Sequence, residues 1–268
     1  MKKFTFVSTV FAIAYFVSCW PVALASYGLL EISVDTTLTE NHYGNIVIVE
    51  DNVILDCEDF TVQGQGSGSG VGILLNGRTG VTVTRCVVSG FDEGIVVENS
   101  HGNRINVNTV RENFASGIRL HSSQHNEITR NRVIDNQSED SSGATALIIG
   151  QVSSNNLVNF NTVTGNESTG IVVADPGSDR NRIVANVSSY NGGHGFDIIS
   201  VRLNTFRGNI AVDNGDVGFH VHGEAEFNSL TVNSACGNNT LDAVDNKAFD
   251  GGRGNFWFNN LFCTKQGF

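Results

Sequence analysis

The sequence is poor in proline, methionine and charge. Its 268 residues include two prolines, one methionine and only 16% charged residues, whereas an average globular domain has roughly 25%. Exposed helices are built mainly from alanine, glutamate, lysine, leucine and arginine, so this shortage argues against a helical bundle or a coiled coil. Intrinsic disorder is disfavoured as well, because 40% of the residues are hydrophobic and disordered chains lack such content.

Glycine and asparagine are abundant instead. The chain contains 30 glycines and 31 asparagines, and both residue types tolerate left-handed backbone angles. The composition therefore predicts a protein with many tight corners.

Between residues 94 and 240 the sequence repeats a frame of three asparagines, each separated from the next by four residues. Two residues after each first asparagine comes an apolar side chain, and most copies begin with a glycine followed by two apolar residues one position apart. Three asparagines in fixed register through six copies indicate a repeat architecture. The copies are Asn103/Asn108/Asn113, Asn126/Asn131/Asn136, Asn156/Asn161/Asn166, Asn181/Asn186/Asn191, Asn204/Asn209/Asn214 and Asn228/Asn233/Asn238.

Each copy has room for two or three strands of about three to five residues, too short to pair with one another. Such strands pair with their equivalents in the next copy, roughly 4.8 Å along an axis, so equivalent residues stack. We expect the corner asparagines to take the left-handed angle while their amides bond the coils above and below. The sequence therefore predicts an all-β parallel solenoid of about 8–10 short coils with asparagine ladders.

Residues 1–25 have the pattern of a secretory signal peptide. Lys2 and Lys3 precede an apolar stretch, and Ala23–Ala25 supplies a small-x-small cleavage site. A membrane anchor is the alternative, which the short apolar run and the polar chain that follows disfavour. We therefore expect an exported protein, secreted, periplasmic or at the cell surface. Its single domain, residues 26–268, would comprise opening coils at 26–70, regular repeats at 94–240 and a terminal coil and cap at 241–268.

The protein is acidic. Removing Lys2 and Lys3 takes the formal charge from −11 to −13, which argues against binding to nucleic acid or anionic membranes. No later segment is apolar enough to cross a bilayer. The net negative charge of the protein also repels a polyanionic sugar unless a local basic patch or bridging cations intervene.

Four cysteines follow the leader. Cys236 lies three residues after Asn233 and Cys263 three residues after Asn260, so they occupy one register on successive coils, within the separation that a disulfide tolerates. Cys57 and Cys86 lie on neighbouring N-terminal coils. In an exported chain this predicts the disulfides Cys57–Cys86 and Cys236–Cys263, one at each end, with buried thiols as the alternative. The absence of a CxxC pair or a Cys/His cluster with zinc spacing argues against a structural metal site.

The repeats resemble the right-handed parallel β-helix superfamily, in particular its branch of carbohydrate-binding and sugar-hydrolase proteins and periplasmic copper-site maturation proteins. The resemblance covers most of the mature chain and includes its first coils at Asp35–Thr39, Asn45–Ile48, Leu55–Cys57 and Val81–Cys86. It implies a right-handed parallel β-helix. The superfamily hosts lyases, hydrolases, epimerases and adhesins, so the fold alone leaves the function open.

Two segments interrupt the rhythm of the repeat. Gln63–Gly70 has the composition of a flexible Gly/Ser loop, and Gln137–Thr145 lengthens one turn. Insertions in solenoids gather on the face that meets ligands, although some are tolerated without a role.

The positions two and four residues after each opening glycine point outward and form two rows. Titratable groups gather in these rows at two places: Glu98, Arg119 and His121 beside the long turn, and Asp197, His220 and His222 nearer the C-terminus. The rows are Val96, Arg119, Ile148, Val172, Asp197 and His220, and Glu98, His121, Gly150, Ala174, Ile199 and His222.

Asp197 and His220 are expected to stack about 5 Å apart, within reach of a hydrogen bond. A carboxylate beside an imidazole poises the histidine as a general acid or base. Asp197, His220 and His222 are thus the candidate catalytic residues for abstracting the C5 proton of a uronic acid. The candidate substrate-binding residues are Arg119, His121, Glu98 and His194; Arg119 would neutralise the sugar carboxylate and His121 donate a proton, if the sugar spans three to four coils.

The segment His194-Gly195-Phe196-Asp197-Ile198-Ile199 is similar to the Tyr-Gly-Phe-Asp-Pro-His motif of the mannuronan C5-epimerases and related alginate lyases. The glycine, phenylalanine and aspartate match, which implies that Asp197 is the catalytic carboxylate. The tyrosine and histidine of that motif, which carry its proton transfers, have no counterpart here.

The sequence most concretely predicts an exported lyase or epimerase of a uronate polymer. The alternatives are a non-catalytic carbohydrate-binding protein and a structural or adhesin-like surface solenoid, in which the polar rows are an ordinary solvated face. The expected partner is a polysaccharide or a cell-surface glycan, and the expected state is a monomer. We expect no cofactor, with calcium as the alternative, although the acidic residues suggest no clear calcium site. They also suggest no hydrolase carboxylate pair, and the mature chain has no methionine for copper. Trp257 and Phe258 are expected to cap the core.

Overall fold

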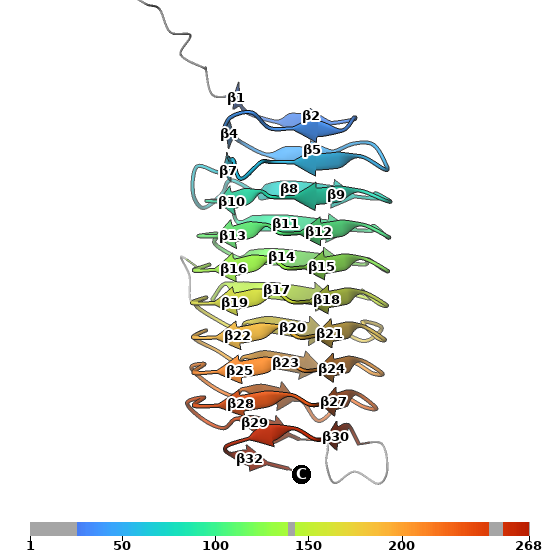
Figure 1. Cartoon of the computed structure of the whole chain (residues 1–268), viewed down its shortest axis with the longest axis vertical. Coiled ribbons are helices and arrows are strands. Elements are labelled where there is room, and N and C mark those ends of the chain that lie inside the picture. Colours follow the sequence, from blue (N-terminus) through green and yellow to red (C-terminus); the bar gives the residue numbers. More distant parts are fainter. Residues whose placement is uncertain (1–25, 139–142, 247–253, 268) are drawn as a thin grey trace, which may run out of the picture.

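The computed structural model describes residues 26–138, 143–246 and 254–267, and within them all regular secondary structure is β. The predicted signal peptide and the tip of the long turn, residues 139–142, lie outside the described residues. The described residues form 32 short strands, and every third strand lies in the same sheet. Figure 1 shows these strands wound into one tall stack. None of the described residues forms a helix that could span a bilayer.

Three parallel sheets run along the stack, and in each sheet a strand pairs with the equivalent strands of the coils before and after it. The sheet that we call A holds β1 (Ser26–Tyr27), β4 (His42–Tyr43), β7 (Thr61–Gln63), β10 (Val87–Ser89), β13 (Thr109–Arg111), β16 (Arg132–Ile134), β19 (Thr162–Thr164), β22 (Val187–Ser189), β25 (Ile210–Val212), β28 (Ser234–Cys236) and β31 (Leu261–Phe262). Sheet B holds β2 (Leu30–Ile32), β5 (Ile46–Ile48), β8 (Val71–Asn76), β11 (Glu93–Glu98), β14 (Ser116–His121), β17 (Thr145–Gly150), β20 (Ile171–Ala174), β23 (Phe196–Ile199), β26 (Phe219–Val221), β29 (Ala243–Asp245) and β32 (Lys265–Gln266). Sheet C holds β3 (Thr36–Thr37), β6 (Ile54–Asp56), β9 (Thr82–Thr84), β12 (Arg104–Asn106), β15 (Glu127–Thr129), β18 (Leu157–Asn159), β21 (Arg182–Val184), β24 (Thr205–Arg207), β27 (Ser229–Thr231) and β30 (Phe256–Phe258).

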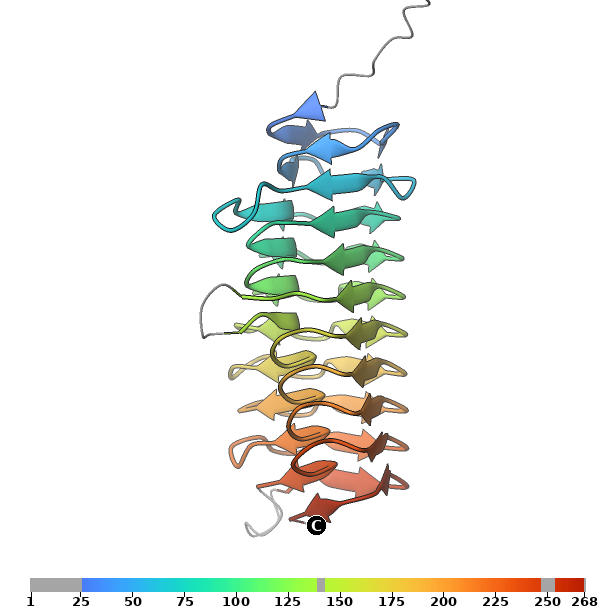
Figure 2. The same cartoon turned by 90° about the vertical axis from the view of Figure 1, so that its left-hand side faces the viewer.

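This arrangement confirms the parallel solenoid that the asparagine frame predicts. Sheets A and B each have 11 strands and sheet C has ten, which corresponds to about ten coils. Figure 2, turned by 90°, shows the coils lying one above another along the same axis.

The core is filled by apolar rows that the repeat sets in register. The apolar residue two positions after each first asparagine is fully buried in all six copies, and Phe196 stacks on Phe219 with ring centroids 4.6 Å apart. Fully burying such a side chain stabilises the fold by about 1.5–3 kcal/mol. The row consists of Ile105, Ile128, Val158, Ile183, Phe206 and Leu230.

The asparagine ladders are present, and they lie inside the solenoid. All 18 side chains of the frame are no more than 9% exposed. At Asn161, Oδ1 accepts the backbone N–H and the side-chain amide of Asn131 at 2.9 and 3.0 Å, while Nδ2 donates to the Ile128 carbonyl and to Asn186 Oδ1 at 2.8 and 2.9 Å. The ladder thus satisfies backbone groups that the narrow corners would otherwise leave unpaired.

The left-handed residue at each corner is not the asparagine, and the sequence-based expectation was wrong on this point. Among non-glycine residues, the positive φ falls on the position before the ladder asparagine, for example at Val107 (59°), Phe160 (56°) and Val232 (58°). The asparagine itself must point its amide inward to bond its neighbours, so the sharp turn falls on the preceding residue, whose side chain faces solvent. A branched residue there is strained by about 1–2 kcal/mol.

Replacing Val107 by asparagine is expected to raise the free energy of unfolding by about 1 kcal/mol, because asparagine tolerates this backbone angle. Val107 is already 45% exposed, so little burial is lost. Denaturant unfolding measures the gain, and Val232→Asn, at 52% exposure with the same geometry, should reproduce it. Val34→Asn is the control, since Val34 is exposed but has no positive φ. Equal effects of all three substitutions would contradict the explanation.

The Gly/Ser loop at Gln63–Gly70 is anchored, whereas its composition predicts flexibility. The two carboxylate oxygens of Asp92 accept the backbone N–H groups of Gly68 and Gly70 at 2.7 and 2.8 Å. The Gln65 N–H also donates to Ser69 Oγ at 3.0 Å. A side chain from the next coil therefore holds this loop against the stack.

Both predicted disulfides are present and staple neighbouring coils. The Cα atoms are 4.7 Å apart in Cys57–Cys86 and 5.2 Å apart in Cys236–Cys263. At the C-terminal end Trp257 packs against the core, as expected, and donates from Nε1 to Asp245 Oδ2 at 2.7 Å. Phe258, expected to cap the core with it, is 54% exposed, because alternate residues of β30 face outward.

One asparagine ladder ends on a buried carboxylate. Asp242 Oδ1 accepts the backbone N–H and side-chain amide of Asn238 at 3.1 and 2.7 Å, and Oδ2 accepts the backbone N–H and hydroxyl of Thr264, both at 2.8 Å. Burial raises the pKa of Asp242, but these hydrogen bonds together outweigh it and hold the pKa below its ordinary value.

Asp242 should stabilise the fold at neutral pH and lose this effect in acid. Because the folded pKa is depressed, its contribution is complete above the unfolded pKa of about 3.9 and disappears as the pH falls through the lower folded value. We expect Asp242→Asn to reduce the free energy of unfolding by about 2 kcal/mol at pH 7, since the new amide faces the Thr264 donors. Denaturant unfolding at a series of pH values should show this difference shrinking below about pH 4. A difference that grows in acid would refute the role given to the carboxylate.

Candidate functional site

Sheet B carries the candidate residues in the predicted register. Val96 pairs with Arg119 and Glu98 with His121 between β11 and β14, and Asp197 pairs with His220 between β23 and β26. The repeat thus fixes which side chains can meet. Asp197 lies outward between the inward Phe196 and Ile198, yet it is only 8% exposed, because the surrounding histidines cover it.

His222, which directly follows β26, forms a hydrogen-bonded pair with Asp197. Its Nε2 lies 3.0 Å from Asp197 Oδ1 with good geometry. A carboxylate only accepts, so the proton lies on Nε2 and the lone pair of Nδ1 is left available. The His222 side chain is 38% exposed, and no described residue donates to Nδ1. The pair therefore presents an oriented, accessible base.

His220 contacts the same carboxylate oxygen in a different way. Its Nδ1 lies 3.1 Å from Asp197 Oδ1, but the atom is buried and makes no hydrogen bond of acceptable geometry with any described residue. The other ring nitrogen, Nε2, lies 3.2 Å from the side-chain amide of Asn246. The predicted contact between Asp197 and His220 is confirmed, while its orientation is not that of a simple hydrogen bond.

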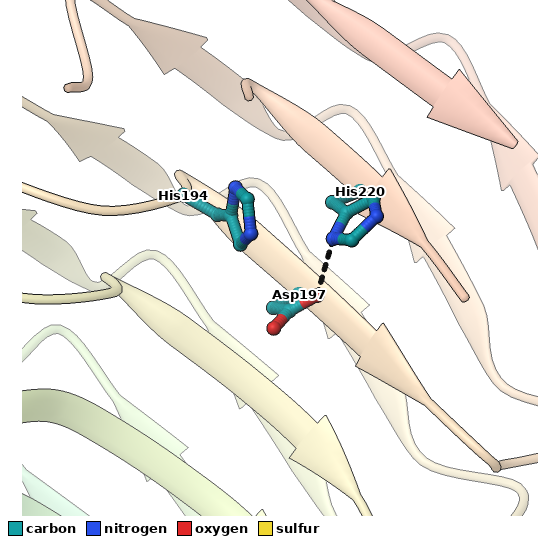
Figure 3. Close-up of side chains that lie close together, drawn as sticks. All are labelled: His194, Asp197 and His220. Atoms are coloured by element: carbon teal, nitrogen blue, oxygen red, sulfur yellow. Dashed lines mark ion pairs between the residues drawn. The ribbon is translucent and has the colours of Figure 1, made fainter. Parts of the chain in front are cut away.

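His194, just before β23, completes a group of three histidines around one aspartate. Figure 3 shows its ring and that of His220 beside the Asp197 carboxylate; ring centroids are 4.5 Å apart for His194 and His220 and 4.2 Å for His220 and His222. Burial lowers the pKa of His194; Asp197 and Asp216 act in the opposite direction, and the neighbouring histidines lower it further. His194 Nδ1 accepts the backbone N–H of Val217 at 3.2 Å and lies 3.4 Å from Asp216 Oδ2.

The other group of candidates, nearer the N-terminus, is organised around an ion pair. Arg119 donates from Nε and Nη2 to the two oxygens of Glu93 at 2.6 and 2.7 Å, and its Nη1 lies 3.0 Å from His121 Nδ1. Glu98 is half-buried on the neighbouring coil, opposite His121. A bidentate partner compensates the guanidinium, so Arg119 is not a free cation.

The structure does not bring the two groups of candidates together. Arg119 and Asp197 belong to one row, but the residues between them are Ile148 and Val172. Three coil steps of about 4.8 Å separate them by about 14 Å. The parallel row contributes only Gly150 and Ala174 between His121 and Ile199. The outer face of sheet B therefore carries two groups of polar residues, separated by an apolar strip.

Three residues of these groups were not predicted from the sequence. Glu93 lies before the opening glycine and Asn246 follows β29, so neither belongs to the two rows. The position of Asp216 in the repeat does not indicate which residue it contacts. All three could have been found by extending the register to the residues just before the opening glycine and just after the strand. The two rows begin two residues after that glycine, so they omit Glu93 even though it is the first residue of β11.

A hollow adjoins the Asp197 group at the turns that follow β20, β23 and β26. Its volume is about 450 Å³, and within it Ser200 Oγ donates to Glu224 Oε2 at 2.8 Å while Arg202 pairs with Glu226 at 3.2 Å. The lining residues are Pro176, Gly177, Asp179, Ser200, Arg202, Glu224 and Glu226. Ser200 and Glu224 lie within three residues of Asp197 and His222 in the chain.

Comparison with known sequences identifies the fold family. Residues 32–146 and 71–241 match the family model described as right handed beta helix region. No curated protein matches the chain at a significant level.

Solved structures show the same fold at low sequence identity. A double mutant of the periplasmic alginate epimerase AlgG aligns with a TM-score of 0.61 at 15% identity over 88% of this chain and 70% of its own. The pectate lyase Pel9A aligns with a TM-score of 0.63 at 13% identity over 91% and 71% of the two chains. The Dettilon tailspike protein aligns with a TM-score of 0.56 at 15% identity over 87% and 52%.

Proposed function

The chain belongs to the right-handed β-helix family, and on that premise we propose that it is an exported protein acting on a uronate-containing polysaccharide, with Asp197 and His222 as its acid–base pair. Export fits the two disulfides, which persist in oxidising compartments. The alginate epimerase and the pectate lyase of the same fold act on polyuronates, as their names state.

The observation that carries the proposal is the hydrogen bond from His222 Nε2 to Asp197 Oδ1. It fixes the tautomer of His222 and leaves Nδ1 free on the outer face of sheet B. Asp197 also stabilises the imidazolium that forms when Nδ1 takes a proton. A nearly buried carboxylate that orients a half-exposed imidazole is an arrangement suited to proton abstraction.

The reaction begins when His222 removes the proton at C5 of a uronic acid. The C5–H electrons pass to the adjacent sugar carboxylate, which must be neutralised by a positive charge. In an epimerase a proton returns to the opposite face of C5. In a lyase the electrons form a C4–C5 double bond, and the C4–O bond breaks with protonation of the leaving oxygen. Protonated His222 returns its proton to the leaving oxygen in the lyase reaction, and in the epimerase reaction the second proton comes from water.

In this proposal Arg119, His121 and Glu98 bind the polymer about 14 Å away along sheet B. The ion pair with Glu93 holds the Arg119 guanidinium in place. Because Arg119 therefore stays about 14 Å from Asp197, it contacts a different sugar residue from the one that reacts. The apolar strip between the two groups suits the ring faces of the intervening sugars.

A panel of polymers tests the proposal. Purified protein is incubated with alginate, pectate and glycosaminoglycans, while ultraviolet absorbance reports unsaturated products and proton NMR reports epimerisation. We expect turnover of one polymer that is lost in His220→Ala combined with His222→Ala. No change in any polymer would leave only a non-catalytic binding or structural role, and activity that survives the double substitution would reject the site.

A further inference from the structure

We propose that His194, Asp197 and His220 form a binding site for one divalent transition-metal ion of the zinc type. One ligand atom from each residue lies within 4.8 Å of the others, and Figure 3 shows the three side chains gathered on the same face. Two imidazole nitrogens and one carboxylate oxygen are a donor set that suits zinc and its first-row neighbours, with positions left open for water or substrate.

The contact between His220 and Asp197 supports a shared ion over a hydrogen bond. Nδ1 and Oδ1 are 3.1 Å apart, yet Nδ1 is buried and its hydrogen-bonding capacity is unused among the described residues. Two ligands that are each about 2.1 Å from one metal lie about 3.0–3.4 Å apart, with their lone pairs directed at the metal and not at each other. The observed separation and misalignment both agree with that geometry.

His194 has the outer partner that a metal-bound histidine needs. For a lone pair of its ring to face the ion, it must give up the 3.2 Å hydrogen bond from the Val217 N–H. The tautomer with a proton on Nδ1 then donates to Asp216 Oδ2, 3.4 Å away, and leaves the Nε2 lone pair for the metal.

The other two proposed ligands, His220 and Asp197, also have hydrogen-bond partners that fix their orientation. His220 Nε2 lies 3.2 Å from the Asn246 amide, which accepts an Nε2–H once the amide is turned by 180°. His222 donates to Asp197 Oδ1 and so fixes the carboxylate. Each ligand therefore has a partner that sets its orientation, which is common in metal sites and not needed on a merely solvated face.

The donor set also selects the ion. Ca²⁺ and Mg²⁺ prefer oxygen ligands, so two imidazoles disfavour them. The role of the ion rests on the proposed function: beside His222 it supplies the positive charge opposite the sugar carboxylate, which Arg119 cannot supply from three coils away.

Calorimetric titration of the untagged, chelator-treated full chain with Zn²⁺ tests the site without any glycan. We expect one ion per chain, at least tenfold weaker binding in Asp197→Asn and in His220→Gln, and about tenfold weaker binding in Asp216→Asn. His101→Gln is the matched control, because His101 is exposed at a corner outside this group, and Ca²⁺ should give no binding. Circular dichroism verifies that each variant keeps its β-structure.

Two results would overturn the site: no one-to-one binding of Zn²⁺ by the unaltered protein, or binding that neither Asp197→Asn nor His220→Gln weakens. Co²⁺ provides a second measurement, because its visible absorption should report nitrogen ligands in the unaltered protein and lose intensity in His220→Gln. The failures are distinguishable: Zn²⁺ binding without turnover of any polymer retains the site and rejects the proposed function. Turnover by a protein that binds no Zn²⁺ does the reverse.

Discussion

Replacing Asp197 by asparagine is expected to lower turnover of the polysaccharide about 1,000-fold, because the amide no longer stabilises the imidazolium and no longer fixes the proton on His222 Nε2. The amide still fits between His220 and His222. Initial rates on the polymer identified by the panel measure the loss. Asp59→Asn provides the control, since Asp59 is exposed at a corner and asparagine tolerates its positive φ of 65°.

His222→Gln separates this catalytic role from metal binding. It removes the base and should reduce turnover by a factor of about 100 to 10,000. Because His222 is not one of the proposed ligands, Zn²⁺ affinity should change far less than in His220→Gln. Should Asp197→Asn keep more than a tenth of the normal rate, the acid–base pair has been assigned to the wrong residues.

Asn161→Ala should reduce the free energy of unfolding by about 4 kcal/mol, a larger loss than that expected for Asp242→Asn. The side chain makes four hydrogen bonds in the middle of a buried ladder. Its removal deprives two N–H groups of Asn131 of their acceptor and the Ile128 carbonyl of a donor, while Asn186 Oδ1 keeps the backbone N–H of residue 161. Each such buried group costs roughly 1–3 kcal/mol, partly recovered by relaxation.

Denaturant unfolding combined with hydrogen exchange measures the effect of Asn161→Ala. Exchange is needed because a solenoid can open locally around the altered coil before it unfolds as a whole. The control is Thr162→Ala, an exposed neighbour on β19, which should change stability by well under about 1 kcal/mol. Similar losses from the two substitutions would mean that the ladder contributes little.

The asparagine frame allowed much of the fold and part of the site to be predicted, because it sets the register of every coil. Once that register is known, Asp197 must lie beside His220, and Cys236 beside Cys263. No side-chain rotamer enters such an inference. This is why the stacking of strands and the core rows followed from the spacing, and the disulfides from the spacing together with the expected export.

What the spacing did not reveal depends on where individual side chains turn. Glu93 lies outside the rows but folds back to bind Arg119. His194 bends to accept a hydrogen bond from the next coil. Which of two adjacent corner residues takes the left-handed angle also depends on side-chain direction. The ladder asparagine points inward because its amide forms hydrogen bonds there, so the preceding residue takes the positive φ.

The ladders also align the dipoles of their side-chain amides along the axis of the solenoid. Three ladders run from Asn103 to Asn255, from Asn108 to Asn260 and from Asn113 to Asn238. In every step for which a side-chain bond between asparagines is formed, Nδ2 points toward the C-terminal coil and Oδ1 toward the N-terminal one. Amide dipoles aligned head to tail reinforce one another and leave a positive end. Asp242 and Asp245 stand at that end of two ladders, so their carboxylates act as terminators of a polar stack. A longer protein could therefore be built by inserting whole repeats among the central coils, whereas repeats added after Asp242 would meet a carboxylate, which has no N–H to donate to the next coil.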